Sequence, residues 1–359
     1  MTPGAHELEM ATVTDTEDGR VESEKSAPLR VTVVGATAPV QDRSLQSGER
    51  ITTGDGVSLE ASAIASAHDD ITDLAVTSHG RLIVAERNGS IVFHTPAASF
   101  NTAVNPTDGE VLAIAPDPNF EQTRQLFVLQ SKPSVFRVVR YRLVERQLID
   151  RMIVLPDVAA SSDPAGTLRF GPDGKLYAAF DNAGSIAAAA RLAEWSGKVL
   201  RVNADGTTPD DQPAASPVVW ANLSRPRGLA WSGEGSVMYL AERGVDGVER
   251  LRAITSEGRP RRASLRSSYV LPAPVGAAAL AVAAGDAIPE FRGNLFVAAR
   301  EGGYLLRVRF EEGNLATPKT SEKLLEGRLG ELRAVVASPD ALYVANRDSV
   351  WRLVPVRAQ

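Results

Sequence analysis

The sequence predicts an all-β protein: a six-bladed β-propeller preceded by a disordered N-terminal tail. Short apolar runs bounded by turn residues recur after about residue 70, and helical patterning is weak. The recurring unit is roughly 48 residues long, within the range of repeats that build propeller blades. Two separate β domains are the structural alternative, although no linker divides the repeats.

The chain divides into three parts. Residues 1–28 are polar and acidic, a composition typical of a disordered segment. Residues 29–66 contain one alternating strand, Leu29–Gly35, followed by a linker. This strand either pairs with the last blade near Val350–Val354, closing the ring and hiding both edges, or is an unrelated outer strand. Residues 67–359 are predicted to form the six blades.

The first repeat shows the repeating unit most clearly. Residues 80–86 and 90–94 are apolar runs on either side of Asn88-Gly89, which is a strong hairpin signal. Related runs follow at 124–129 with 134–140, 174–180 with 197–202, 235–242, 293–299 with 304–308, and 340–345 with 349–353. The best helix candidate is the short, Ala-rich stretch from Ser185 to Trp195.

Composition excludes several classes of function. The net charge of −5 argues against a protein that binds nucleic acid, and the absence of cysteine removes disulfides, thiolate metal sites and cysteine nucleophiles. No apolar run reaches the roughly 18 residues of a membrane helix, and the N-terminus lacks the pattern of an export signal. The four histidines are scattered along the chain, which argues against a zinc enzyme. The sequence has no phosphate-binding loop, which argues against a nucleotide-binding enzyme.

Motifs in several blades resemble, in order and spacing, the signatures of the soluble glucose/sorbosone dehydrogenases. They are Gly109–Phe120, Leu168–Tyr177, Ser196–Gly206, Arg225–Trp231, Ala241–Gly244, Arg292–Ala298 and Leu332–Val335. This family is built on a six-bladed propeller and depends on pyrroloquinoline quinone (PQQ). The resemblance implies oxidation of the anomeric carbon of a small sugar, with PQQ and calcium as cofactors. It also implies work outside the cytoplasm, although no signal peptide is visible here.

The position of the family's histidine base is occupied by Asp163 in this chain. The resemblance therefore implies Asp163 as the catalytic residue. The reference pKa of Asp lies about 2.6 units below that of His, so Asp163 would need burial or a neighbouring carboxylate to act near neutral pH. The alternative is that Asp163 caps the loop before Pro164.

The resemblance also implies residues that bind PQQ. Ser224 and Arg225 stand where the family has an Arg-Asn pair, and Arg227 replaces a glutamine. The position of the family's fifth-blade lysine falls on Glu301, or on Arg300 after a slip of one residue. In the last blade the family has two arginines; Arg333 keeps one of them, and Glu331 replaces the other. The implied cofactor residues are Ser224, Arg225, Arg300 and Arg333, with a structural role as the alternative for Arg225. If the site is retained, Asp163 and the three arginines should converge on one end of the central funnel.

In the family, calcium is held by backbone carbonyls, and the matching residues are Gly244 and Val245. An ordinary turn at the exit of a strand is the alternative, because the family's proline is missing and Arg243 adds a positive charge. Since anchoring charges are lost or shifted, a second interpretation of function stays open. In it, the propeller is a non-catalytic binding module for carbohydrate or a protein partner.

Overall fold

The computed structural model describes residues 4–9, 11–16, 19–26, 29–33, 44–95, 99–213, 216–257, 262–286 and 288–356. The chain forms two units, Met1–Arg43 and Ser44–Gln359. In the first unit, β1 (Gly4–Leu8) pairs with β4 (Leu29–Val33), and β2 (Val13–Thr16) pairs with β3 (Gly19–Glu22). The disordered tail predicted for residues 1–28 lies partly outside the described residues.

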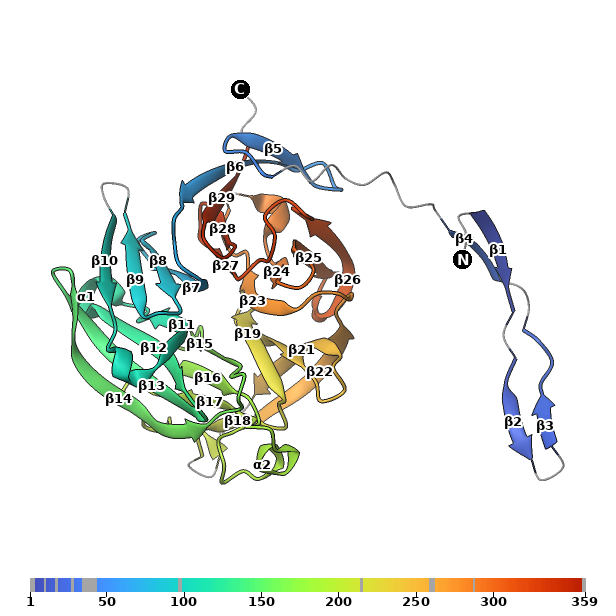
Figure 1. Ribbon diagram of the computed structural model, residues 1–359, viewed down its shortest axis with the longest axis horizontal. Coiled ribbons are helices and arrows are strands. Elements are labelled where there is room, and N and C mark those ends of the chain that lie inside the picture. Colours follow the sequence, from blue (N-terminus) through green and yellow to red (C-terminus); the bar gives the residue numbers. More distant parts are fainter. Residues whose placement is uncertain are drawn as a thin grey trace. The chain divides into compact units, whose positions relative to one another are not determined.

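The second unit consists of six antiparallel sheets set radially around a centre, which confirms the predicted six-bladed propeller (Figure 1). Blade 1 is β7 (Ile71–Val76), β8 (Leu82–Glu86), β9 (Ser90–His94) and β10 (Ser99–Ala103). Blade 2 is β11 (Glu110–Pro116), β12 (Gln125–Lys132), β13 (Val135–Val144) and β14 (Gln147–Ala159). Blade 3 is β15 (Gly166–Phe170), β16 (Leu176–Phe180), β17 (Val199–Val202) and β18 (Val218–Trp220).

The remaining blades continue the same order from the centre outwards. Blade 4 is β19 (Arg225–Trp231), β20 (Val237–Arg243), β21 (Glu249–Glu257) and β22 (Arg262–Val270). Blade 5 is β23 (Ala277–Val282), β24 (Leu295–Ala299), β25 (Tyr304–Glu311) and β26 (Asn314–Leu324). Blade 6 is β27 (Ala334–Ala337), β28 (Leu342–Ala345), β29 (Val350–Pro355) and β6 (Ser58–Ala65), with β5 (Glu49–Thr52) outside it.

The ring is closed by β6, which supplies the fourth strand of a blade whose other strands come from the C-terminus. It pairs with β29, so that Ala65 lies opposite Val350 and Leu59 opposite Pro355. Of the two alternatives for Leu29–Gly35, pairing with the last blade is not found, because β4 within this segment pairs with β1. Closure by β6 needs only a short connection to β7, and the buried Leu59 and Ala61 fill the blade 5–blade 6 seam.

The core lies in the seams between blades. Among the described residues, six apolar clusters form, one between each pair of neighbouring blades around the ring. Successive side chains of a strand point to opposite faces, so the second strand of a blade is buried on both sides. This explains why β8, β16 and β24 are apolar at nearly every position, with every residue buried.

Local signals in the sequence match the elements they predicted. The Asn88 side chain accepts a hydrogen bond of 2.8 Å from the amide of Ser90, and Gly89 adopts a φ of 99° in the hairpin between β8 and β9. The helix candidate forms only α2 (Ile186–Ala190), which Ser185 caps at its N-terminus. Other short helical elements among the described residues are α1 (Phe120–Thr123) and the 3₁₀ turns at Pro106–Asp108 and Pro289–Phe291.

The inner strands of the blades contact one another in cyclic order around the axis. A buried ion pair strengthens this contact: both terminal nitrogens of Arg169 on β15 donate to Asp73 on β7, at 2.6 and 2.7 Å. The amide of Ile114 on β11 also donates to Asp73, at 2.9 Å. One carboxylate therefore joins three consecutive blades near the axis.

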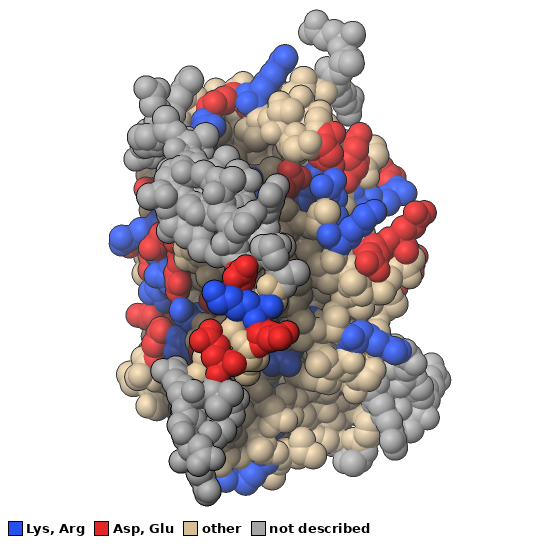
Figure 2. Space-filling model, turned by 90° about the vertical axis from the view of Figure 1, so that its right-hand side faces the viewer, with Lys and Arg blue, Asp and Glu red and all other residues tan. Residues whose placement is uncertain are grey.

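The described surface carries charges of both signs. On the face shown in Figure 2, the visible basic and acidic side chains are interspersed. Within the described residues, none of the helices has the length and apolar character needed to span a membrane.

Candidate active site

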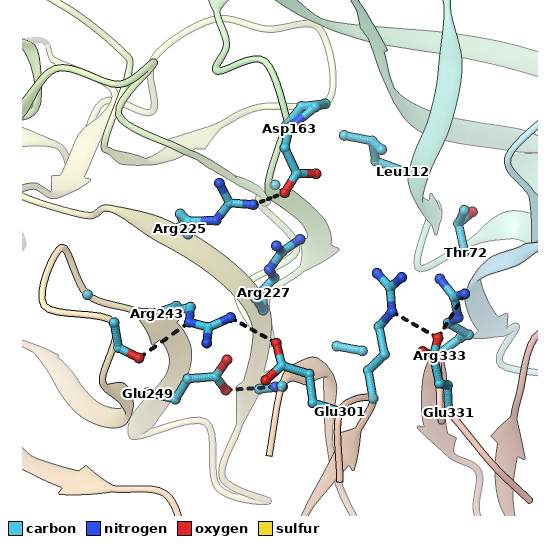
Figure 3. A pocket seen from close by; sticks show the side chains of 18 of the residues that line it. Thr72, Leu112, Asp163, Arg225, Arg227, Arg243, Glu249, Glu301, Glu331 and Arg333 are labelled. Carbon is cyan, nitrogen blue, oxygen red and sulfur yellow. Dashed lines mark hydrogen bonds and ion pairs between the residues drawn. The ribbon is translucent and has the colours of Figure 1, made fainter. Parts of the chain in front are cut away.

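A cavity of about 660 Å³ opens at the end of the propeller where the inner strands begin (Figure 3). Blades 1 to 5 reach it through the first residues of their inner strands or the loops before them, and blade 6 reaches it through the residues before β27. Loops from the ends of the second strands also contribute, including Arg87, Gly244 and Arg300. Six blades therefore direct side chains to one chamber around the axis, a position typical of ligand sites.

Irregular pairing aims several of these side chains at the axis. In four blades the register between the first and second strands shifts within the first three residues of the inner strand. A β-bulge leaves one residue without a partner opposite it and turns its side chain away from the regular face. The four bulge residues all line the cavity: Thr72, Leu112, Arg227 and Ala278. Arg227 is thus an arginine at a position where the other three blades place small or apolar side chains.

Charged groups dominate the lining, with six arginines and four carboxylates and hence an excess of two positive charges. Most of these charges are paired. Arg225 binds Asp163, Arg243 binds Glu301 at 2.8 Å, and Glu331 binds both Arg300 at 3.2 Å and Arg333 at 3.1 Å. Arg87 pairs with Asp70 at 2.6 Å, just outside the cavity.

Arg227 is different, because it forms no ion pair or hydrogen bond with another described residue. Figure 3 shows its guanidinium between those of Arg225 and Arg243, with no interaction marked. Burial lowers the pKa of Arg227, and the positive charge of Arg225 lowers it further. Among the described residues, the buried Nε atom of Arg333 has no hydrogen-bond partner. The cavity therefore holds guanidinium groups that an anionic ligand would satisfy.

Glu249 is the least exposed carboxylate in the lining, at 9%. It begins β21, and its Oε2 accepts a hydrogen bond of 2.7 Å from the amide of Ala277 at the start of β23. Burial raises its pKa, although that hydrogen bond and the charge of Arg243 oppose the shift. A carboxyl group with a raised pKa in a cavity is a candidate for proton transfer.

Asp163, Arg225, Arg300 and Arg333 all line this cavity, so the predicted convergence of these four residues is confirmed. The surroundings of Asp163 do not meet the requirement set for a base, however. Its side chain is 78% exposed, and its Oδ2 accepts a hydrogen bond from Arg225. Glu301, which stands at the family's lysine position, is neutralised by Arg243.

Ser224 does not line the central cavity. It borders a separate pocket of about 240 Å³ beside α2, and its amide donates to the buried Glu242 at 3.2 Å. Its place just before β19 turns it away from the axis, whereas Arg225 and the bulged Arg227 face inward. The structure thus assigns Ser224 to the support of the blade and not to the chamber.

Gly244 and Val245 line the cavity, but they give a poor set of ligands for calcium. The Gly244 carbonyl already accepts a hydrogen bond of 3.0 Å from the amide of Gly247. The nearby carboxylate of Asp246 is bound by Arg250 at 2.6 Å. Among the described residues, no group of three or more acidic or histidine side chains could hold a metal ion. Calcium favours six to eight oxygen ligands, which this turn does not provide.

Reasoning from the sequence did not select Arg87, Arg227, Arg243 or Glu249 as site residues, yet all four line the cavity. Arg227 was visible only as a replacement for a glutamine, and the bulge that directs it inward has no sequence signature of its own. Glu249 could have been found from its position five residues after Gly244, at the start of the next strand.

Comparison with protein families and solved structures agrees with this architecture. The family model described as glucose/sorbosone dehydrogenase matches residues 68–259 and 258–354. The PQQ-bound aldose sugar dehydrogenase of Streptomyces coelicolor is 22% identical, with a TM-score of 0.70 over 83% of this chain and 98% of that chain. A putative oxidoreductase (glucose dehydrogenase) of Thermus thermophilus is 25% identical, with a TM-score of 0.67 over 82% and 99%.

The apo-form of the soluble aldose sugar dehydrogenase of Escherichia coli is 18% identical, with a TM-score of 0.67 over 83% of this chain and 100% of that chain. No curated protein matches the sequence. The structural likenesses cover almost the whole of the solved chains, so the six-bladed fold is shared from end to end.

Proposed function

This chain belongs to the glucose/sorbosone dehydrogenase family, and from that premise we propose that it is a PQQ-dependent sugar dehydrogenase that oxidises the anomeric carbon of an aldose. The observation that carries the proposal is Arg227, which has no partner among the described residues and lies in a cavity with an excess of positive charge. Fold membership alone would not justify an activity, because related propellers can host different sites.

The lining fits a cofactor with three carboxylates. Arg227 has no partner within the described part of the protein, and the Nε atom of Arg333 is buried without one. Each can donate a charge-assisted hydrogen bond to a carboxylate or a quinone oxygen. Arg225 and Arg300 also line the cavity and already hold exposed carboxylates, which a bound anion can displace. When bound, PQQ supplies a quinone that accepts hydride, a chemistry that protein side chains lack.

The protein's own contribution is to bind, orient and move a proton. The lining has an excess of two positive charges in a partly enclosed space, which favours entry of an anion. The bulge at Arg227 holds its guanidinium near the axis, where it can align the cofactor against a sugar entering from the open side. A buried carboxylate at Glu249 is available for the proton that leaves the sugar hydroxyl.

Calcium has no part in this proposal, because Gly244 and Val245 fit the metal poorly. The guanidinium of Arg227 places a fixed positive charge in the same chamber, so we expect PQQ binding to depend little on calcium. The family's usual metal dependence and the residues of this chain therefore lead to different expectations, which a titration can separate.

The test is calorimetric titration of the full chain with PQQ, once with added calcium and once with a chelator, followed by dye reduction with aldoses. We expect saturable binding at one site per chain under both conditions, and dye reduction that needs both PQQ and an aldose. Binding without dye reduction would favour the non-catalytic binding module. Failure to bind PQQ under either condition would refute the proposed function.

A further inference from the structure

Two charged side chains in the cavity lining, one basic and one acidic, form no ion pair with other described residues. Of the ten charged side chains in the lining, eight form ion pairs, and the two without one in the described structure are Arg227 and Glu249. They are also close enough that the charge of each affects the pKa of the other. Unpaired, desolvated charges cost stability, so their presence together at the centre of a cavity points to a role in chemistry.

The position of Glu249 leaves one carboxylate oxygen free. Oε2 is fixed by the amide of Ala277, which belongs to the neighbouring blade. Oε1 accepts no hydrogen bond from the described residues and is not sealed from solvent, so it is accessible from the cavity that Glu249 lines. A carboxylate held by one oxygen and open at the other is oriented to receive a proton.

The charged groups around Glu249 come from three other strands or strand ends. Arg227 belongs to β19, Arg243 ends β20, and Glu301 follows β24. Burial is the largest effect and raises the pKa of Glu249; Glu301 adds to this, while Arg243 and Arg227 act in the opposite direction. The carboxylate therefore has a higher affinity for a proton than an exposed glutamate, and guanidinium groups stay within reach of its anion.

We propose that Glu249, and not Asp163, is the catalytic residue that takes the proton from the anomeric hydroxyl of the sugar. This inference rests on the proposed function. As the C1–H bond of the aldose breaks, its electron pair leaves with the hydrogen as hydride to the quinone of PQQ, which is the oxidant. The hydroxyl proton passes to Oε1 of Glu249, a C1=O double bond forms, and the pyranose becomes a lactone. Arg227 stabilises the negative charge that develops on oxygen during this transfer.

Asp163 is the competing candidate, and its contacts argue against it. Its Oδ2 is bound by Arg225, and its side chain is largely in solvent. Asp163 therefore has one oxygen already occupied and lies in solvent, whereas Glu249 has a free oxygen and a desolvated environment.

The experiment compares the wild-type full chain with Glu249→Gln and Asp163→Asn. Gln keeps an oxygen to accept the Ala277 amide, so folding is preserved, and thermal unfolding checks this. We expect Glu249→Gln to bind PQQ within about threefold of wild type but to slow single-turnover oxidation by about 10²–10⁴-fold, the usual contribution of a general base. The acid limb of the pH profile of kcat/KM should disappear in Glu249→Gln and persist in Asp163→Asn and Glu249→Asp. The exposed Glu311→Gln serves as the matched control and should resemble wild type.

A second readout does not depend on turnover. Infrared difference spectra of the apo protein should show a carboxyl band that titrates above the ordinary range of glutamate, and this band should be missing in Glu249→Gln. Retention of rate and acid limb in Glu249→Gln, loss of the limb in Asp163→Asn instead, or an unchanged infrared titration would each overturn the assignment. Absence of PQQ binding in the wild type would remove the proposed function and the assignment together, while active wild type with active Glu249→Gln would remove the assignment alone.

Discussion

Replacing Arg227 by glutamine should weaken ligand binding without destabilising the protein. In the cavity, the guanidinium has no partner among the described residues and is available to an anion. A hydrogen bond to a charged group contributes about 1.5–3 kcal/mol, so Arg227→Gln should weaken PQQ binding about ten- to hundredfold. Coulomb attraction at about 4 Å and an effective dielectric constant near 20 sets an upper bound of about 4 kcal/mol.

The free energy of unfolding of Arg227→Gln should not fall below that of the wild type. Burial and the neighbouring Arg225 disfavour the charged form of Arg227 in the folded state, which is what its lowered pKa expresses. The arginine is charged at neutral pH in both folded and unfolded states, so folding bears the desolvation cost without a compensating pair. Removing the charge should therefore leave the free energy of unfolding of the apo protein unchanged or raise it.

Arg169→Gln is the matched control, since Arg169 is another arginine on an inner strand. It forms two hydrogen bonds with the buried Asp73, and its loss leaves that carboxylate with backbone amide donors but no cationic partner. Breaking such a pair costs about 3–5 kcal/mol, so this variant should be clearly destabilised. Urea unfolding of the apo proteins and calorimetric PQQ titration measure both quantities. Equal PQQ affinity in wild type and Arg227→Gln, or destabilisation of Arg227→Gln comparable to that of Arg169→Gln, would refute the reasoning.

Three further changes test the structure more widely. The hydrogen bond from Arg307 lowers the pKa of Asp55 to about 2. The ionised carboxylate therefore stabilises the fold at pH values above the ordinary pKa of Asp, and this stabilisation is lost as the pH falls through about 2. Because Asp55 is partly exposed, Asp55→Asn should cost about 1 kcal/mol at pH 7 by urea unfolding, with the difference vanishing in strong acid. Gly109→Ala should destabilise by at least about 2 kcal/mol in the same assay, because φ is 103° and a Cβ would lie 2.0 Å from the Ser131 oxygen; a wild-type midpoint would contradict this. The raised pKa of Glu249 means that stability from its neutral form is present in acid and lost as pH rises through the folded pKa. The stability of Glu249→Gln should thus equal that of the wild type in acid and exceed it near neutral pH. Thermal unfolding measured across this pH range tests the prediction, and a variant less stable than the wild type near neutral pH would contradict it.

Periodic features of the fold were predictable because they are repeated and local. The all-apolar runs at β8, β16 and β24 follow directly from burial on both faces, and the Asn88-Gly89 hairpin follows from turn chemistry. The identity of the closing strand was not predictable in this way. Leu29–Val33 alternates as well as β6 does, and only the short path from β6 into β7 favours the latter.

The candidate site shows the same division. Asp163, Arg225, Arg300 and Arg333 could be placed together because each lies at the same end of its blade. That Arg225 binds Asp163 could not be predicted in the same way, because an ion pair depends on where two loops from different blades approach each other.

By itself, the order of residues determined the number of blades, their strands and the end of the ring at which charged groups gather, since these depend on periodic burial and short turns. Only the tertiary structure decided which of those charges neutralise one another and which stay unpaired. The reason is physical: an ion pair or a raised pKa depends on distance and desolvation between segments far apart in the chain, and a bulge that shifts one residue redirects an entire side chain.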